Sequence, residues 1–70
     1  MRKKKIFLLS DLRKAKGLSQ RDLATYVDIS PGAIGLYESG RRKPSLENAL
    51  KISNFFEVPV EQIKFNNSKL

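Results

Sequence analysis

The segment Ser19–Pro44, SQRDLATYVDISPGAIGLYESGRRKP, decides the fold because it carries the start and stop signals of two short helices. Ser19 and Asp22 fit a capping box, in which each side chain accepts a hydrogen bond from the backbone N–H of the other residue. One apolar helical face follows at helical spacing, formed by Leu23, Ala24 and Val27. The first helix is therefore predicted to begin at Ser19 and to end at the turn Asp28-Ile29.

The second helix of this segment has equally clear boundaries. Ser30 is predicted to be its N-cap and Pro31 its first helical residue, a combination typical of helix starts. Ile34 and Tyr37 continue the apolar face, and Gly40 provides the left-handed conformation in which many helices end. Two helices joined by a turn of this length form a helix-turn-helix, here over residues of about 20–39.

Composition limits the chemistry that this chain can perform. Its 70 residues are expected to form one domain, 1–70, which buries only about 60% of the surface of the unfolded chain. The absence of cysteine excludes disulfides and thiolate metal sites, and the absence of histidine removes the commonest general base and metal ligand. Seven carboxylates lack a catalytic partner at helical spacing, so we expect no enzyme, metal or cofactor.

The charge of the chain points to a polyanionic partner. Fourteen Lys and Arg against seven Asp and Glu give a net charge of +7, and such an excess on a small domain is typical of nucleic-acid binding. No apolar run reaches the ~18 residues of a membrane span. The basic arm 1–5 precedes only four apolar residues, too few for a signal peptide, so we expect a cytoplasmic protein, associated with the nucleoid when bound to DNA.

Helical spacing elsewhere predicts an all-α fold of five helices. The other three are expected at roughly Phe7–Lys16, from Ser45 to Phe56, and from Val60 to about Lys64, before a loose tail. The fourth helix shows an amphipathic stripe made of Leu46, Ala49, Leu50, Ser53 and Phe56. The apolar ends Ile6–Leu9 and Ile63–Phe65 leave three alternatives: a short β-ribbon, a dimer contact, or half-exposed surface.

Several short motifs together resemble the Cro/phage-repressor (Xre-type) helix-turn-helix family. The resemblance rests on Gly17–Gln20, Leu23-Ala24, Ile29-Ser30, Ile34, Tyr37–Gly40, Pro44–Leu46 and Phe56–Ile63. It implies a compact, five-helix, lambda-repressor-like domain that binds double-stranded operator DNA, usually as a homodimer. Most members repress transcription, some activate it, and some are antitoxins.

The resemblance also implies which residues face DNA. Gln20 falls where the family contacts a phosphate at a helix N-terminus, a position that attracts anions, and Arg21 adds a second candidate contact. Ser30 either contacts DNA or only caps its helix. The base-contacting positions of the recognition helix correspond to Pro31, Gly32, Gly35 and Leu36. These four carry no side-chain donor, so specificity is expected from DNA shape, from Arg41 and Arg42, or from the N-terminal arm.

Further residues follow from the same resemblance. The cluster Arg41, Arg42 and Lys43 lies where the family grips backbone phosphates, although a charge run can also be a solvated surface. Arg13 and Glu38 occupy positions that often form a salt bridge between the first and third helices. Asp28 replaces a frequent glycine in the turn, where the backbone favours positive φ.

The end of the chain supplies the expected dimer interface. It consists of Val58, Val60, Ile63 and Phe65, unless these side chains only close the core of the monomer. Two other functions use the same fold, an antitoxin and a protein-interaction module. We favour a DNA-binding repressor, because Gln20 and the basic cluster suit DNA and no toxin-binding segment is evident after Phe65.

Overall fold

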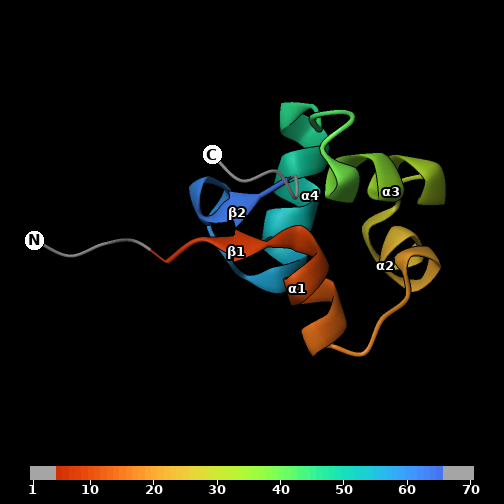
Figure 1. The fold of residues 1–70 in the computed structure, drawn as a ribbon, viewed down its shortest axis with the longest axis horizontal. Helices are drawn as coiled ribbons and strands as arrows, with labels where there is room; N and C mark the ends of the chain where they lie inside the picture. The colour runs from red at the N-terminus through yellow and green to blue at the C-terminus, as the bar shows by residue number, and fades with distance from the viewer. Residues whose placement is uncertain (1–4, 66–70) are drawn as a thin grey trace, which may run out of the picture.

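The computed structural model describes residues 5–65, which form four α-helices and one pair of short strands around a single core (Figure 1). In chain order the elements are β1 (Phe7–Leu8), α1 (Leu9–Ala15), α2 (Gln20–Val27), α3 (Pro31–Ser39), α4 (Leu46–Phe56), the 3-10 helix η1 (Val60–Gln62) and β2 (Ile63–Lys64). The predicted basic arm, apart from Lys5, and the predicted loose tail lie outside the described residues. Within residues 5–65, no helix is both long enough and apolar enough to span a membrane.

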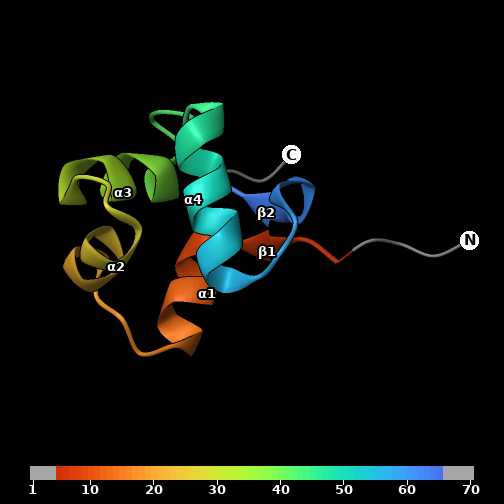
Figure 2. The same cartoon turned by 180° about the vertical axis from the view of Figure 1, so that it is seen from behind.

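The two strands decide between the alternatives for the apolar ends of the fold. β1 and β2 pair in parallel, with Phe7 opposite Ile63 and Leu8 opposite Lys64. Figures 1 and 2 place this pair on the side of α4 that is remote from α2 and α3. The ribbon alternative is therefore confirmed. Phe7 and Leu8 within it are half-buried, which also fits the surface alternative, and the dimer contact stays a prediction.

The strand pair also corrects two predicted helices. The first helix begins at Leu9 rather than Phe7, because the preceding residues bond to β2 instead of continuing the helix. The predicted fifth helix is only a three-residue 3-10 turn that leads directly into β2. Five α-helices are thus replaced, within the described residues, by four α-helices and the short η1.

Each α-helix contributes one fully buried aliphatic side chain to the core. These side chains are Leu9 from α1, Leu23 from α2, Ile34 from α3 and Ile52 from α4. The surrounding core residues are Ala24, Val27, Ile29, Tyr37, Phe56 and Ile63. The core therefore joins all four helices and the second strand into one unit.

The apolar face of α4 differs from the predicted stripe. Leu46 and Leu50 are 72% and 45% exposed, whereas Ile52 is completely buried. Ala49, Ser53 and Phe56 are buried as expected. These three residues fit a buried face that includes Ile52 as well as one that includes Leu46 and Leu50. The placement of Leu46 and Leu50 on the buried face of this helix is therefore wrong.

Candidate nucleic-acid interface

The first helix of the helix-turn-helix is α2, and its capping box is formed as predicted. The Ser19 Oγ accepts from the Asp22 backbone N–H at 2.9 Å, and the Asp22 Oδ2 accepts from the Ser19 N–H at 3.0 Å. The backbone and side-chain hydrogen bonds from Ser19 lower the pKa of the Asp22 carboxyl group below its usual value. A negative charge thus stays at the positive end of α2, which stabilises the helix start.

The turn between the two helices requires an unusual backbone conformation. Asp28 has φ 57° and ψ 52°, in the left-handed region that Asp and Asn adopt more readily than most residues. Ile29 is buried and donates its backbone N–H to the Ala24 carbonyl at 3.0 Å. The Ser30 hydroxyl accepts from the Ala33 N–H at 3.2 Å, so that α3 begins at Pro31.

A buried carboxylate fixes α3 against α1. Glu38 is 5% exposed, and its two oxygens accept from the Arg13 Nε at 2.7 Å and Nη2 at 3.1 Å. The Arg13 Nη1 donates to the Leu18 carbonyl at 2.8 Å. This two-bond ion pair, which the resemblance implied, determines the orientation as well as the position of α3.

A second polar contact, which the sequence reasoning missed, fixes α3 against α4. The hydroxyl of Tyr37 accepts from the Asn48 Nδ2 at 3.0 Å, and the tyrosine ring packs edge-on against Phe65. Helical spacing predicts that Tyr37 is buried, but it gives no signal for its partner on another helix. Neighbouring residues of α3 are thus attached to α1 and to α4.

Gln20 is the first residue of α2, and its side chain extends towards α3. Its Nε2 donates to the Glu38 Oε1 at 3.0 Å. The side chain is therefore held by a buried group while the residue as a whole remains exposed. Arg21 beside it is also exposed, as the phosphate role proposed for it requires.

The predicted base-contacting residues lie on α3 with different exposures. Pro31 and Gly32 are exposed at its start, whereas Gly35 and Leu36 are half-buried in its middle. An added Cβ at Gly32 would meet no atom within 4 Å, but one at Gly35 would meet the amide of Gln20. The outer surface of α3 is therefore bare at Gly32 and is approached by a side chain of α2 at Gly35.

The basic residues Arg41–Lys43 directly follow the C-terminal end of α3, which Gly40 caps. Gly40 has φ 79°, which only glycine adopts without a steric penalty, and it lets the chain turn back. The backbone N–H groups of Arg41 and Arg42 then bond to the Leu36 carbonyl at 3.0 and 3.3 Å. These N–H groups are therefore satisfied. The charged side chains of Arg41, Arg42 and the next residue Lys43 are all exposed, as the phosphate contacts predicted for them require.

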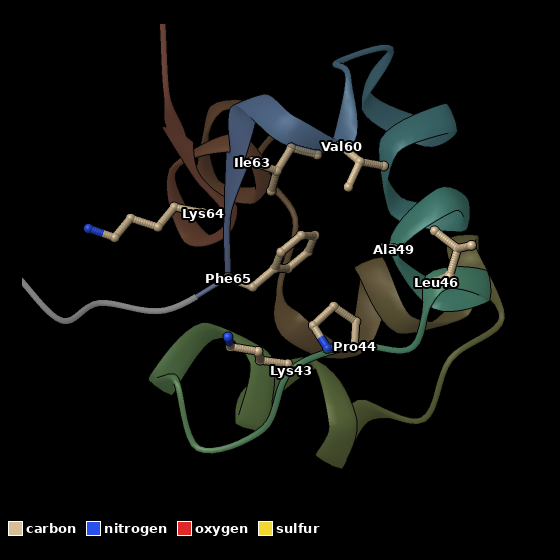
Figure 3. A pocket seen from close by; sticks show the side chains of 8 residues that line it. All are labelled: Lys43, Pro44, Leu46, Ala49, Val60, Ile63, Lys64 and Phe65. Carbon is tan, nitrogen blue, oxygen red and sulfur yellow. The ribbon is translucent and has the colours of Figure 1, made fainter. Parts of the chain in front are cut away.

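The residues predicted at a dimer interface all contribute to the packing of one chain. Ile63 is buried, Val58 and Phe65 pack against the core, and Val60 is half-buried. Ile63, Phe65 and Val60 also line a pocket of about 480 Å³, shown in Figure 3. The remaining lining residues are Lys43, Pro44, Leu46, Ala49 and Lys64. Dimerisation through this region stays a prediction.

Comparisons with known proteins agree with this geometry. A family model described as helix-turn-helix matches residues 9–63. The HTH-type transcriptional activator BcrR of Enterococcus faecalis is 38% identical over 55 residues, which are 79% of this chain and 27% of BcrR. The CTXphi transcriptional repressor RstR of Vibrio cholerae is 29% identical over 55 residues, 79% of this chain and 50% of RstR.

A third relative is of similar size to this chain. The uncharacterized HTH-type transcriptional regulator MJ0272 of Methanocaldococcus jannaschii is 41% identical over 51 residues, 73% of this chain and 77% of that protein. By contrast, the chain spans about a quarter of BcrR and half of RstR. No solved structure matches the chain. The family and the relatives' names support the expected class, a DNA-binding transcriptional regulator.

Proposed function

The chain belongs to the helix-turn-helix family, and from this membership we propose that it represses transcription by binding operator DNA. The observation that carries the proposal is the rigid attachment of α3. Glu38 ties it to α1 and Tyr37 ties it to α4, while exposed cations follow its C-terminal end. A helix that is fixed in this way can enter the major groove in one orientation, with phosphate contacts beside it.

The exposed cations are expected to contact the DNA backbone on both sides of the groove. Arg21 lies at the start of α2, and Arg41, Arg42 and Lys43 lie in the loop after α3. If three or four of these cations engage phosphates in each subunit, a dimer neutralises about six to eight charges. At about −0.9 per phosphate, the slope of log K against log salt is expected to be about −5 to −7.

A salt titration with two DNA sequences tests this assignment. Arg41→Ala and Arg42→Ala should each flatten the slope by about 1–2 per dimer and weaken binding to operator and random DNA alike. Leu36→Ala is the uncharged control on α3, and it should leave the slope unchanged while altering the preference among operators. An unchanged slope in both arginine variants would refute the proposed placement of the loop.

We propose that the repressor binds as a homodimer, with a second copy covering the pocket of Figure 3. Leu46 and Leu50 are exposed on α4, and Leu46 also lines this pocket. A protruding leucine beside a largely apolar hollow, which Lys43 and Lys64 border, can be self-complementary about a two-fold axis. Such a dimer matches a pseudo-palindromic operator with half-sites about 34–36 Å apart.

The dimer is tested with an operator obtained by selection from a random DNA pool. The measured quantity is the ratio of the affinity for the full operator to the affinity for one half-site. Leu46→Glu should reduce this ratio towards one, because it places a charge in the interface without disturbing the monomer core. Thr25→Glu adds the same charge at an exposed position of α2 and should leave the ratio unchanged. A half-site that the wild-type chain binds as tightly as the full operator, in a 1:1 complex, would rule the dimer out.

A reporter gene tests repression directly. The selected operator is placed over the promoter, and expression of the chain should lower reporter output, whereas expression of Arg41→Ala should lower it less. An increase in output would overturn the repressor assignment in favour of an activator. If the random-pool selection enriches no sequence, the fold serves another purpose, such as protein interaction.

A further inference from the structure

The outer surface of α3 lacks the side chains that usually contact base edges. Pro31, Gly32, Gly35 and Leu36 carry neither a side-chain donor nor an acceptor. At Gly32 the space is open, with no atom within 4 Å of a built Cβ. A hydrogen bond from this face to a base edge therefore has to come from the backbone or from a side chain that another element supplies.

Gln20 of α2 supplies a side chain at the position of Gly35. A Cβ built on Gly35 would lie 3.4 Å from the Gln20 Oε1 and 3.9 Å from both its Cδ and its Nε2. The Gln20 amide thus lies directly over the bare part of α3, where the side chain of a longer residue would begin. Gln20 is exposed as a residue and its hydrogen bond to Glu38 is only partly buried, so a ligand that lies on α3 can reach this side chain.

The buried ion pair determines which way the Gln20 amide faces. Glu38 accepts two hydrogen bonds from Arg13, and as a carboxylate it can accept but not donate. The amide group that faces Glu38 must therefore be the NH2, as the 3.0 Å contact from Nε2 has it. This leaves the Oε1 acceptor and one N–H donor of Gln20 for a ligand.

We propose that Gln20 contacts a base edge in the major groove and takes the role that α3 cannot perform. The inference rests on the proposed binding of DNA. An acceptor and a donor side by side match adenine, whose N6 amino group donates and whose N7 accepts. A phosphate offers no hydrogen-bond donor to Oε1, so a phosphate contact would use the N–H of Gln20 and leave its acceptor unused. Gln20 is thus a specificity-determining residue rather than only a phosphate contact.

Selection from a random DNA pool, with wild-type chain and Gln20→Ala in parallel, tests the proposal. The wild type should prefer adenine at one position in each half-site by about 5- to 100-fold, and Gln20→Ala should lose that preference alone. Arg21→Ala is the matched control, because it lies next in the same helix and should weaken all sequences equally. A uniform loss in Gln20→Ala would overturn the base contact, and so would changed preferences at several positions.

Substitutions at the two glycines test the geometry separately. In Gly35→Leu the side chain must enter the space of the Gln20 amide, whose NH2 signals in a nitrogen–proton NMR spectrum of the free protein should shift. In Gly32→Leu the side chain enters open space, and the same signals should stay in place. Unmoved signals in Gly35→Leu would overturn the placement of the amide.

The outcomes distinguish this inference from the proposed function. If the wild-type chain enriches no DNA sequence, the proposed function itself is refuted. If it enriches a sequence and Gln20→Ala retains the complete profile, DNA binding stands and only the role of Gln20 is refuted.

Discussion

Replacing Glu57 by glycine is expected to stabilise the fold. Glu57 ends α4 with φ 58° and ψ 41°, a left-handed conformation in which its Cβ crowds the backbone. The conformation is imposed by the chain reversal after α4, where the Val58 N–H bonds to the Ser53 carbonyl at 3.1 Å. The Ser53 hydroxyl also donates to the Val58 carbonyl at 2.6 Å, which holds the reversal in place.

The size of the gain follows from two opposing effects. A side chain in the left-handed region costs about 1–2 kcal/mol, which glycine removes. Glycine in turn loses more backbone entropy on folding, by about 0.5–1 kcal/mol. The exposed Glu57 side chain contributes little packing, so the net increase in unfolding free energy should be about 0.5–1 kcal/mol. For a domain of this size, that raises Tm by about 2–8 °C.

Urea unfolding of three variants measures the effect and isolates its cause. Glu57→Gly should raise the unfolding midpoint without changing the slope of free energy against urea. Glu57→Gln keeps the backbone strain and removes only the charge, so its midpoint should stay much closer to that of the wild type. Gly17→Ala should lower the midpoint, because Gly17 has φ 71° and a new Cβ would find no compensating contact within 4 Å. Equal midpoints for Glu57→Gly and Glu57→Gln would refute the strain argument.

Two further predictions concern the core and the first cap. Ile52→Ala should cost about 2–5 kcal/mol in urea unfolding because Ile52 is fully buried, whereas Leu50→Ala, at a 45% exposed site, should cost about 1 kcal/mol or less; equal losses would contradict the observed face of α4. The pKa of Asp22 is lower in the folded chain than its unfolded value of 3.8, so the ionised carboxylate stabilises the fold at pH values above 3.8. This stabilisation is lost as the pH falls from 3.8 through the lower folded pKa. The melting temperature of Asp22→Asn should therefore fall less than that of the wild type when the pH is lowered from 5 to 2. Equal falls in the two melting temperatures would show that the cap bond contributes too little to be measured.

Local signals allowed the helix-turn-helix to be predicted from the sequence. Each helix end of this motif is formed by interactions within a few residues of the chain. This holds for the capping box at Ser19, the Ser30-Pro31 start and the glycine end at Gly40. Such interactions depend on near neighbours, and near neighbours are visible in the sequence. The turn residue Asp28 likewise adopts the positive φ that the family pattern suggested.

The phase of α4 could not be obtained in this way, and the strand pairing was expected only as one of three alternatives. Ala49, Ser53 and Phe56 fit a stripe with Leu46 and Leu50 as well as one with Ile52, and only packing against the other helices selects between them. β1 pairs with a segment at the other end of the domain, which competes with helix formation at both ends. Propensity describes each segment alone, so it assigned helix where a distant partner makes a strand.

In the candidate site, too, local features were predictable and contacts between distant residues were not. The Arg13–Glu38 pair spans 25 residues and was expected only through the family resemblance. The contact of Gln20 with Glu38 had no signal at all, because it joins the start of α2 to the end of α3 and involves a carboxylate that Arg13 of α1 also contacts. Contacts that require three elements at once become visible only when those elements are placed in space.

The parallel pairing of β1 with β2 has a consequence for how this fold can be joined to other segments. It brings the entry and the exit of the domain together at one edge, with Phe7 beside Ile63. Figures 1 and 2 show that this edge lies across α4 from α2 and α3. A segment joined ahead of β1 therefore starts on the side of the domain away from α2 and α3, whereas one joined after β2 starts beside Phe65, which packs against Tyr37 of α3 and lines the pocket of Figure 3. Of the two strands, β1 is thus the one through which a further segment leaves both the face of α3 and the pocket open.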